Sequence, residues 1–147
     1  MIADFRDLLA ELVAHEVRFL VVGAHALAAL GVPRVTADLD LWVEPTPANA
    51  NRAWRALAAF GAPLANLTIR ETDLVQPEQV IQLGLPPYRI DVLTSISGVG
   101  FPEAWAGRVG GTLFDVPVAF LGREAFIRNK RASGRPKDLE DLRALGA

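Results

Sequence analysis

The chain has 147 residues, of which 51% are apolar, so one well-packed domain spanning residues 1–147 is expected. A formal net charge of −2 argues against a general attraction to nucleic acid or membrane, and charged residues interrupt any signal peptide or bilayer span, so we expect a cytoplasmic protein without membrane association. With no cysteine and two histidines, the chain lacks the ligands of a sulfur or histidine metal cage, so any metal must be held by oxygen.

The first half of the chain predicts alternating helices and strands. Residues 4–16 carry apolar residues at the spacing of an amphipathic helix. Residues 17–22 predict a short apolar strand that ends at Gly23, and residues 24–31 predict a brief helix. Residues 34–43, "RVTADLDLWV", predict the second strand.

The second half continues in the same way. Thr46 and Pro47 predict the start of a helix that Gly61 stops, and residues 79–95 predict two strands joined at residues 85–87. Residues 62–79 carry only a weak signal. The remaining predicted elements are a short helix over 101–108, a hairpin over 110–122 around Asp115, and two closing helices over 123–133 and 136–146.

Two acids lie one residue apart in the predicted second strand. Because side chains alternate between the faces of a strand, Leu39 and Leu41 point to one face while Asp38 and Asp40 point to the other. Aspartate is a poor strand former, and two carboxylates about 7 Å apart repel each other. The pattern therefore predicts either open solvent on that face or a cation between the acids.

The elements around this acid pair suggest phosphoryl chemistry. Gly23 ends the first strand where the following backbone N–H groups are free to hold a phosphate, and the acid pair follows fifteen residues later. A phosphate cradle beside a divalent-metal site is the layout of phosphoryl transfer. Asp91 is the candidate third carboxylate. The alternative for Asp91 is a strand-end acid paired with Arg89 or Arg34.

Positive charge gathers near the end of the chain. Lys130 and Lys137 are the only lysines, and both lie among arginines in residues 123–141. Lys130 follows Phe126 by four residues, so we expect it near the buried edge of its helix, whereas Lys137 should face solvent. The alternative is a solvated helix face neutralised by its own acids, Glu124, Asp138, Glu140 and Asp141.

The segment "VVGAHALAALGVPRVTADLDLWV" resembles the signature of the DNA polymerase beta type nucleotidyltransferase superfamily. Together with "FIRNKRASGRPKDLEDLRAL", it is similar to small bacterial nucleotidyltransferases related to the abortive-infection toxins of type IV toxin–antitoxin systems. The resemblance covers about half of the chain. It implies an α/β (α+β) nucleotidyltransferase fold, with a small, mixed, mostly antiparallel sheet flanked by helices and a C-terminal helical pair.

The resemblance also implies a set of site residues. The catalytic and metal-binding acids would hold two Mg²⁺ ions, or Mn²⁺ in their place, and the other members would bind the nucleotide. Arg34 and Thr36 match an Arg-x-Thr that precedes the acids, with Arg34 bracing either the carboxylates or a phosphate. Ala24 departs from the Ser or Gly of the superfamily, so only its backbone N–H can serve. Among the other implied residues, Asp38, Asp40 and Asp91 are the catalytic and metal-binding acids, Lys130 is catalytic and binds the nucleotide, and Gly23 and Asp138 also bind the nucleotide.

The residues and the resemblance together predict the activity. We expect Mg²⁺-dependent transfer of a nucleoside monophosphate from an NTP such as ATP to an acceptor hydroxyl, with pyrophosphate released. The expected acceptor is an RNA end, tRNA included, or a protein, and the expected role is that of a toxin with a cognate antitoxin. One alternative is a catalytically weak or inactive nucleotide-binding regulator or antitoxin partner, which Ala24 favours. A purely structural protein with chance acids is the third interpretation.

Overall fold

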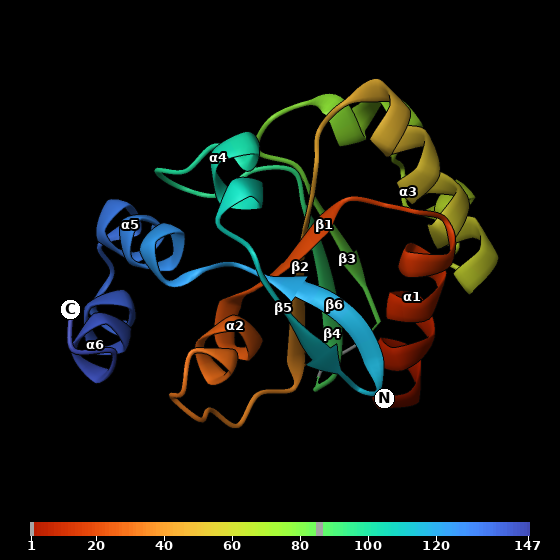
Figure 1. Ribbon diagram of the computed structural model, residues 1–147. Coiled ribbons are helices and arrows are strands. Elements are labelled where there is room, and N and C mark those ends of the chain that lie inside the picture. Colours follow the sequence, from red (N-terminus) through yellow and green to blue (C-terminus); the bar gives the residue numbers. More distant parts are fainter. Residues whose placement is uncertain (1, 85–86) are drawn as a thin grey trace.

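The structure is a computed structural model that describes residues 2–84 and 87–147. Its centre is a six-stranded sheet with the strand order β3-β4-β2-β1-β6-β5 (Figure 1). The pairs β1–β2, β3–β4 and β5–β6 are antiparallel, and the pairs β1–β6 and β2–β4 are parallel, which confirms the predicted mixed, mostly antiparallel sheet. The strands are β1 (Phe19–Val22), β2 (Asp38–Val43), β3 (Val80–Leu83), β4 (Arg89–Leu93), β5 (Val109–Leu113) and β6 (Val116–Phe120).

Helices cover both faces of this sheet. They are α1 (Ile2–Ala14), α2 (Gly23–Ala29), α3 (Pro47–Phe60), α4 (Phe101–Ala106), α5 (Arg123–Ser133) and α6 (Pro136–Ala144). Helices α5 and α6 form the predicted C-terminal pair beside the sheet (Figure 1). Residues 62–79, where the sequence signal is weak, contain two short 3-10 helices. Within the described residues, no helix combines the length and apolar character needed to cross a bilayer.

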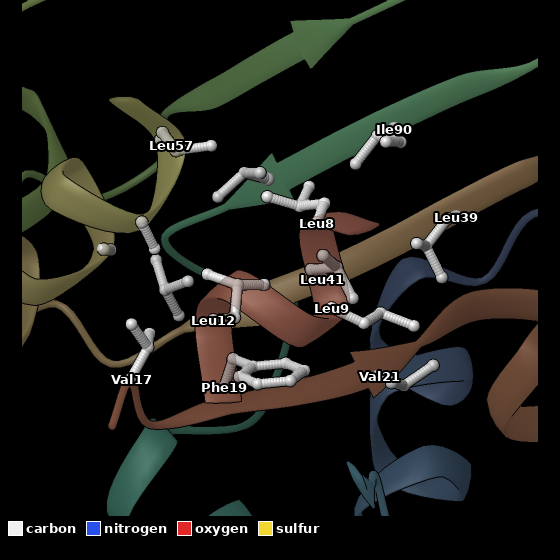
Figure 2. Close-up of a cluster of buried hydrophobic side chains, with 14 of the residues drawn as sticks. Leu8, Leu9, Leu12, Val17, Phe19, Val21, Leu39, Leu41, Leu57 and Ile90 are labelled. Carbon is white, nitrogen blue, oxygen red and sulfur yellow. The ribbon is translucent and has the colours of Figure 1, made fainter. Parts of the chain in front are cut away.

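The sheet separates two apolar clusters. The larger one packs α1 and α3 against one face, and Figure 2 shows Leu8 and Leu12 of α1 over Phe19 and Leu41 of the sheet. The smaller one packs α2, α4 and α5 against the other face, where Trp42 is buried. The alternation predicted for the second strand is confirmed, because its leucines lie in the larger cluster and Trp42 lies in the smaller one.

The residues predicted to begin and end α3 are only partly confirmed. Pro47 begins α3, and Gly61 ends it with a φ of +95°, as predicted. Thr46 occupies the N-cap position, but its hydroxyl donates a hydrogen bond to Glu44 Oε1 at 3.1 Å instead of accepting one from the helix. The predicted junction at residues 85–87 lies partly outside the described residues.

Candidate active site

Strands β2 and β4 bring the three predicted acids to one face of the sheet. They run parallel and in register, with Asp40 opposite Asp91 and Asp38 opposite Arg89. Since alternate residues of a strand share a face, all four side chains project on the face that also carries Trp42. Two like charges on directly paired positions repel each other, so this face is electrostatically unfavourable without a cation.

The glycine turn adjoins the acid pair. Strand β1 pairs with β2 so that Val22 lies opposite Asp40, and Gly23 follows at the start of α2. Gly23 has a φ of +71°, and a Cβ atom on it would collide with Asp40 Oδ2. Helix α2 has only seven residues, so its N-terminus alone does not make an anion site. The main effect of Gly23 is to let the backbone approach the Asp40 carboxylate closely.

Asp40 lies in surroundings that disfavour its ionised form. Burial, followed in importance by the negative charges of Asp91 and Asp38, raises the pKa of Asp40 to about 6. The positive charges of Lys130 and Arg89 act in the opposite direction. The folded chain therefore holds a carboxylate whose ionised form it does not fully compensate, as is common at functional sites.

The donors on this face suit a hard divalent cation. Carboxylate oxygens are the ligands that Mg²⁺ prefers, and Asp91 Oδ1 is buried without a hydrogen-bond partner among the described residues. Asp38 Oδ2 instead lies 3.8 Å from Arg89 Nη2. Across residues 2–84 and 87–147, no group of three or more His, Asp or Glu side chains is arranged as a ready-made metal site. The residues thus fit a cation held by Asp40 and Asp91, with Asp38 engaged by Arg89.

Helix α5 supplies the predicted lysine. The Lys130 side chain is 13% exposed, and its Nζ lies 3.2 Å from Asp138 Oδ1 and 3.7 Å from Asp141 Oδ2. It points inward, as expected, whereas Lys137 is exposed. Lys130 and Asp40 line the same cleft, and the positive charge of Lys130 acts on Asp40.

This cleft has a volume of about 580 Å³, which is within the range of small-molecule sites. Its lining includes Ser95, Ser97 and Asn129, none of which was singled out in the sequence. Asn129 Nδ2 donates a hydrogen bond to the Ser97 carbonyl at 3.0 Å, which fastens the loop after β4 to α5. Gly98, with a φ of +76°, lets this loop approach Ala132 of α5 closely. In the sequence, Gly98 indicates a turn after β4, but nothing there indicates that this loop packs against α5.

Asp138 organises the junction between α5 and α6. Its fully buried carboxylate accepts hydrogen bonds from Ser133 Oγ at 2.7 Å, Arg135 Nε at 2.9 Å and Lys130 Nζ at 3.2 Å. Burial alone would raise the pKa of Asp138, but these hydrogen bonds hold it well below its usual range. Asp138 therefore stays ionised and holds Lys130 in place.

The remaining candidates lie around the start of β2 and α2. Arg34 Nη2 donates a hydrogen bond to Asp141 Oδ1 at 2.7 Å, so the structure pairs Arg34 with a carboxylate of α6. Thr36 Oγ1 accepts a hydrogen bond from the Asp38 N–H at 3.1 Å and fixes the backbone where β2 begins. Asp141 was considered in the sequence only as a partner on a solvated helix face, yet it is buried.

Comparison with solved structures supports this fold. The chain is similar to the crystal structure of a putative nucleotidyltransferase (TM1012) from Thermotoga maritima, with a TM-score of 0.62 and 16% sequence identity over 95% of this chain and 88% of that one. At this identity the likeness shows the fold, and it confirms the predicted nucleotidyltransferase fold. No family model and no curated protein sequence matches the chain.

Proposed function

We propose that this protein is a Mg²⁺-dependent nucleotidyltransferase that moves a nucleoside monophosphate from an NTP to an acceptor hydroxyl. One observation carries the proposal. Gly23, Asp40 and the buried lysine Lys130 line one cleft, and Asp91 lies next to Asp40 on the paired strand β4. Acids for a cation beside a lysine for phosphate oxygens are the elements that phosphoryl transfer needs.

The three acids would hold the metal. Asp40 and Asp91 would bind the first ion, and Asp38 would join them for a second ion on leaving Arg89. Mn²⁺ suits the same oxygen donors. Mg²⁺ bound here would neutralise phosphate oxygens and lower the pKa of the acceptor hydroxyl.

The chain's own residues account for the rest of the reaction. The acceptor oxygen forms a bond to the α-phosphorus while the bond from that phosphorus to the bridging oxygen breaks and pyrophosphate leaves. Asp91 aims the acceptor hydroxyl and takes its proton. Lys130, held by Asp138, offsets the negative charge that builds up on the leaving pyrophosphate. Gly23 lets the backbone lie close against Asp40, beside the acids that would bind the metal.

The finer assignments rest on the resemblance of the C-terminal segment. On that basis the acceptor is RNA, such as a tRNA end, or a protein hydroxyl, and the donor is ATP or another NTP. The protein would then act as the toxin of a toxin–antitoxin pair with a cognate antitoxin. Gene neighbourhood is the direct check of this last point.

Two observations favour a second function, a nucleotide-binding regulator or antitoxin partner with weak or no transfer. Ala24 provides no hydroxyl for the triphosphate. Asp38 is paired with Arg89, its Oδ2 lying 3.8 Å from Arg89 Nη2. The first feature would weaken the hold on the triphosphate, and the second would leave fewer carboxylates free for a metal ion.

A two-step experiment separates these functions. Thermal unfolding is measured first with Mg²⁺ and each NTP, and both an enzyme and a regulator should be stabilised. Total RNA and protein are then incubated with the chain and each α-labelled NTP. Label in a macromolecule with the parent chain, and its absence with Asp91→Asn, is the expected result. Stabilisation without label would favour the regulator. The absence of both stabilisation and label would contradict both functions.

A further inference from the structure

Asp141 joins two cations that come from distant parts of the chain. Its side chain is 6% exposed. One oxygen, Oδ1, lies 2.7 Å from Arg34 Nη2, in the loop before β2, and the other, Oδ2, lies 3.7 Å from Lys130 Nζ on α5. One buried carboxylate on α6 thus links the loop that leads into the acidic strand to the lysine that lines the cleft.

Arg34 remains available to a ligand. Its side chain is 40% exposed, and within the described part of the chain its hydrogen bond through Nη2 to Asp141 is its only one. A guanidinium has five N–H donors in a planar fork, so the others can bind an anion without releasing Asp141. Arg34 and Lys130 are therefore two cations held at a fixed separation by the same carboxylate.

The charges around them favour a polyanion. Three cations, Arg34, Lys130 and Arg135, surround the two carboxylates Asp138 and Asp141, which leaves this cluster with one net positive charge. Lys130 and Arg135 of the cluster line the cleft. A buried ion pair is costly to assemble, and removal of one partner leaves the other uncompensated. These ion pairs therefore suit a role in which they fix the positions of the cations, rather than one in which they stabilise the folded chain.

We propose that Asp141 is a positioning residue that holds Arg34 and Lys130 as one two-cation site for the polyphosphate chain of the nucleotide. The nucleotide part of this inference rests on the proposed function. The polyphosphate part is independent of it, because inorganic triphosphate carries the same phosphate oxygens without base or sugar and can be tested alone.

The direction in which triphosphate affinity changes on Asp141→Asn distinguishes a positioning role from a purely electrostatic one. Asp141→Asn removes a negative charge close to both cations, so Coulomb attraction alone predicts tighter binding of triphosphate. If Asp141 positions the cations, its loss frees Arg34 and loosens Lys130, and binding weakens although the site has become more positive. Glu140→Gln is the matched control, because it removes an exposed acid from the neighbouring position of the same helix.

The experiment is calorimetric titration of inorganic triphosphate, with Mg²⁺, into the parent chain and its variants. We expect Asp141→Asn and Arg34→Met each to weaken binding by about tenfold, which is the loss of one charged hydrogen bond. The double variant should bind no more than a few fold weaker than the worse single variant, because both changes break one contact. Glu140→Gln should bind as tightly as the parent or slightly tighter, and Asp141→Glu should recover part of the lost affinity.

Several results would overturn the inference. They are unchanged or tighter binding in Asp141→Asn with its fold intact, fully additive losses in the double variant, and a parent chain that does not bind triphosphate. If Asp141→Asn unfolds, unchanged binding in Arg34→Met decides against the inference, since that side chain is partly exposed. If all variants behave as expected but the parent transfers no nucleotide, the polyphosphate site stands and the proposed function fails.

Discussion

Asp40 of β2 and Asp91 of β4 face each other directly across two parallel strands. Burial together with this pairing raises the pKa of Asp40 from 3.8 to about 6, so the folded protein binds a proton that the unfolded chain has already released between these pH values. The contribution of Asp40 to stability in metal-free buffer therefore falls as the pH rises from about 4 to about 6.

Asp40→Asn removes this cost. Near pH 7.5, with a chelator present, we expect the variant to be more stable than the parent by about 1 to 3 kcal/mol, since each unit of pKa shift corresponds to about 1.4 kcal/mol. Below about pH 4 the difference should vanish, because Asp40 is then protonated in both states. Urea unfolding at the two pH values measures this. If the variant were less stable than the parent near neutral pH, Asp40 would be a residue that stabilises the fold, and the metal site would have been assigned to the wrong place.

The three acids should differ in their effects on metal and on transfer. We expect Asp40→Asn to abolish Mn²⁺ binding and Asp38→Asn to weaken it, in each case with the fold retained. Asp91→Asn should keep part of the metal–nucleotide affinity but lose transfer, because Asp91 also takes the proton of the acceptor. Electron paramagnetic resonance titration with Mn²⁺, beside a labelled-nucleotide assay, checks this. Equal loss of binding in all three variants would deny Asp91 its separate role.

The two lysines provide a matched pair. Lys130→Ala should abolish transfer, and Lys130→Arg should impair it, since a planar guanidinium cannot replace a compact ammonium among phosphate oxygens and two carboxylates. Lys137→Ala changes an exposed side chain and should stay within about threefold of the parent, as surface changes usually do. Steady-state transfer rates decide, and full activity in Lys130→Ala would return the basic segment to a solvated helix surface.

Asp138 is expected to act on both stability and activity. Asp138→Asn keeps the size of the side chain but removes the charge that Lys130 and Arg135 share, so it should destabilise the fold by about 1 to 3 kcal/mol and lower transfer at least tenfold. The diagnostic readout is KM for the NTP in protein that is still fully folded, which should rise if Lys130 has lost its support. Destabilisation with an unchanged KM would reduce Asp138 to a helix cap.

The sequence could predict the acids but not their partners. Alternation in β2 places Asp38 and Asp40 on one face from local pattern alone, and the apolar neighbours of Asp91 place it on a strand. By contrast, the bond between Arg34 and Asp141 joins residues 107 positions apart, and no periodicity reports such a contact. The sequence therefore left both the role of Arg34 and the burial of Asp141 open.

The loop after β4 was missed for a related reason. Ser95 and Ser97 line the cleft only because Asn129 and the close approach of Gly98 to Ala132 fasten the loop to α5. The sequence of the loop signals a turn, but the helix that receives it lies some 30 residues further on. Tertiary packing, which local propensity does not encode, decides such a position.

The last prediction separates backbone strain from crowding of the site. Gly23 and Gly31 both have positive φ, +71° and +102°, so an alanine at either position is strained by its backbone alone. They differ in surroundings, because a Cβ on Gly23 would collide with Asp40 Oδ2, whereas a Cβ on Gly31 meets open space.

Gly31→Ala should therefore lose about 1 kcal/mol of stability and bind Mg²⁺ and nucleotide like the parent. Gly23→Ala should lose at least as much, because Asp40 Oδ2 can rotate away but Asp40 Cβ would still lie 3.3 Å from the added methyl group. That rotation takes the carboxylate of Asp40 from its place beside Asp91. We expect metal–nucleotide affinity to fall about tenfold or more in Gly23→Ala alone, which is the loss of one charged ligand. Thermal unfolding and calorimetry on the two variants measure both effects. Equal affinity in Gly23→Ala and Gly31→Ala would show that ligand binding does not depend on the position of the Asp40 carboxylate beside Gly23. Asp40 would then not be a metal ligand.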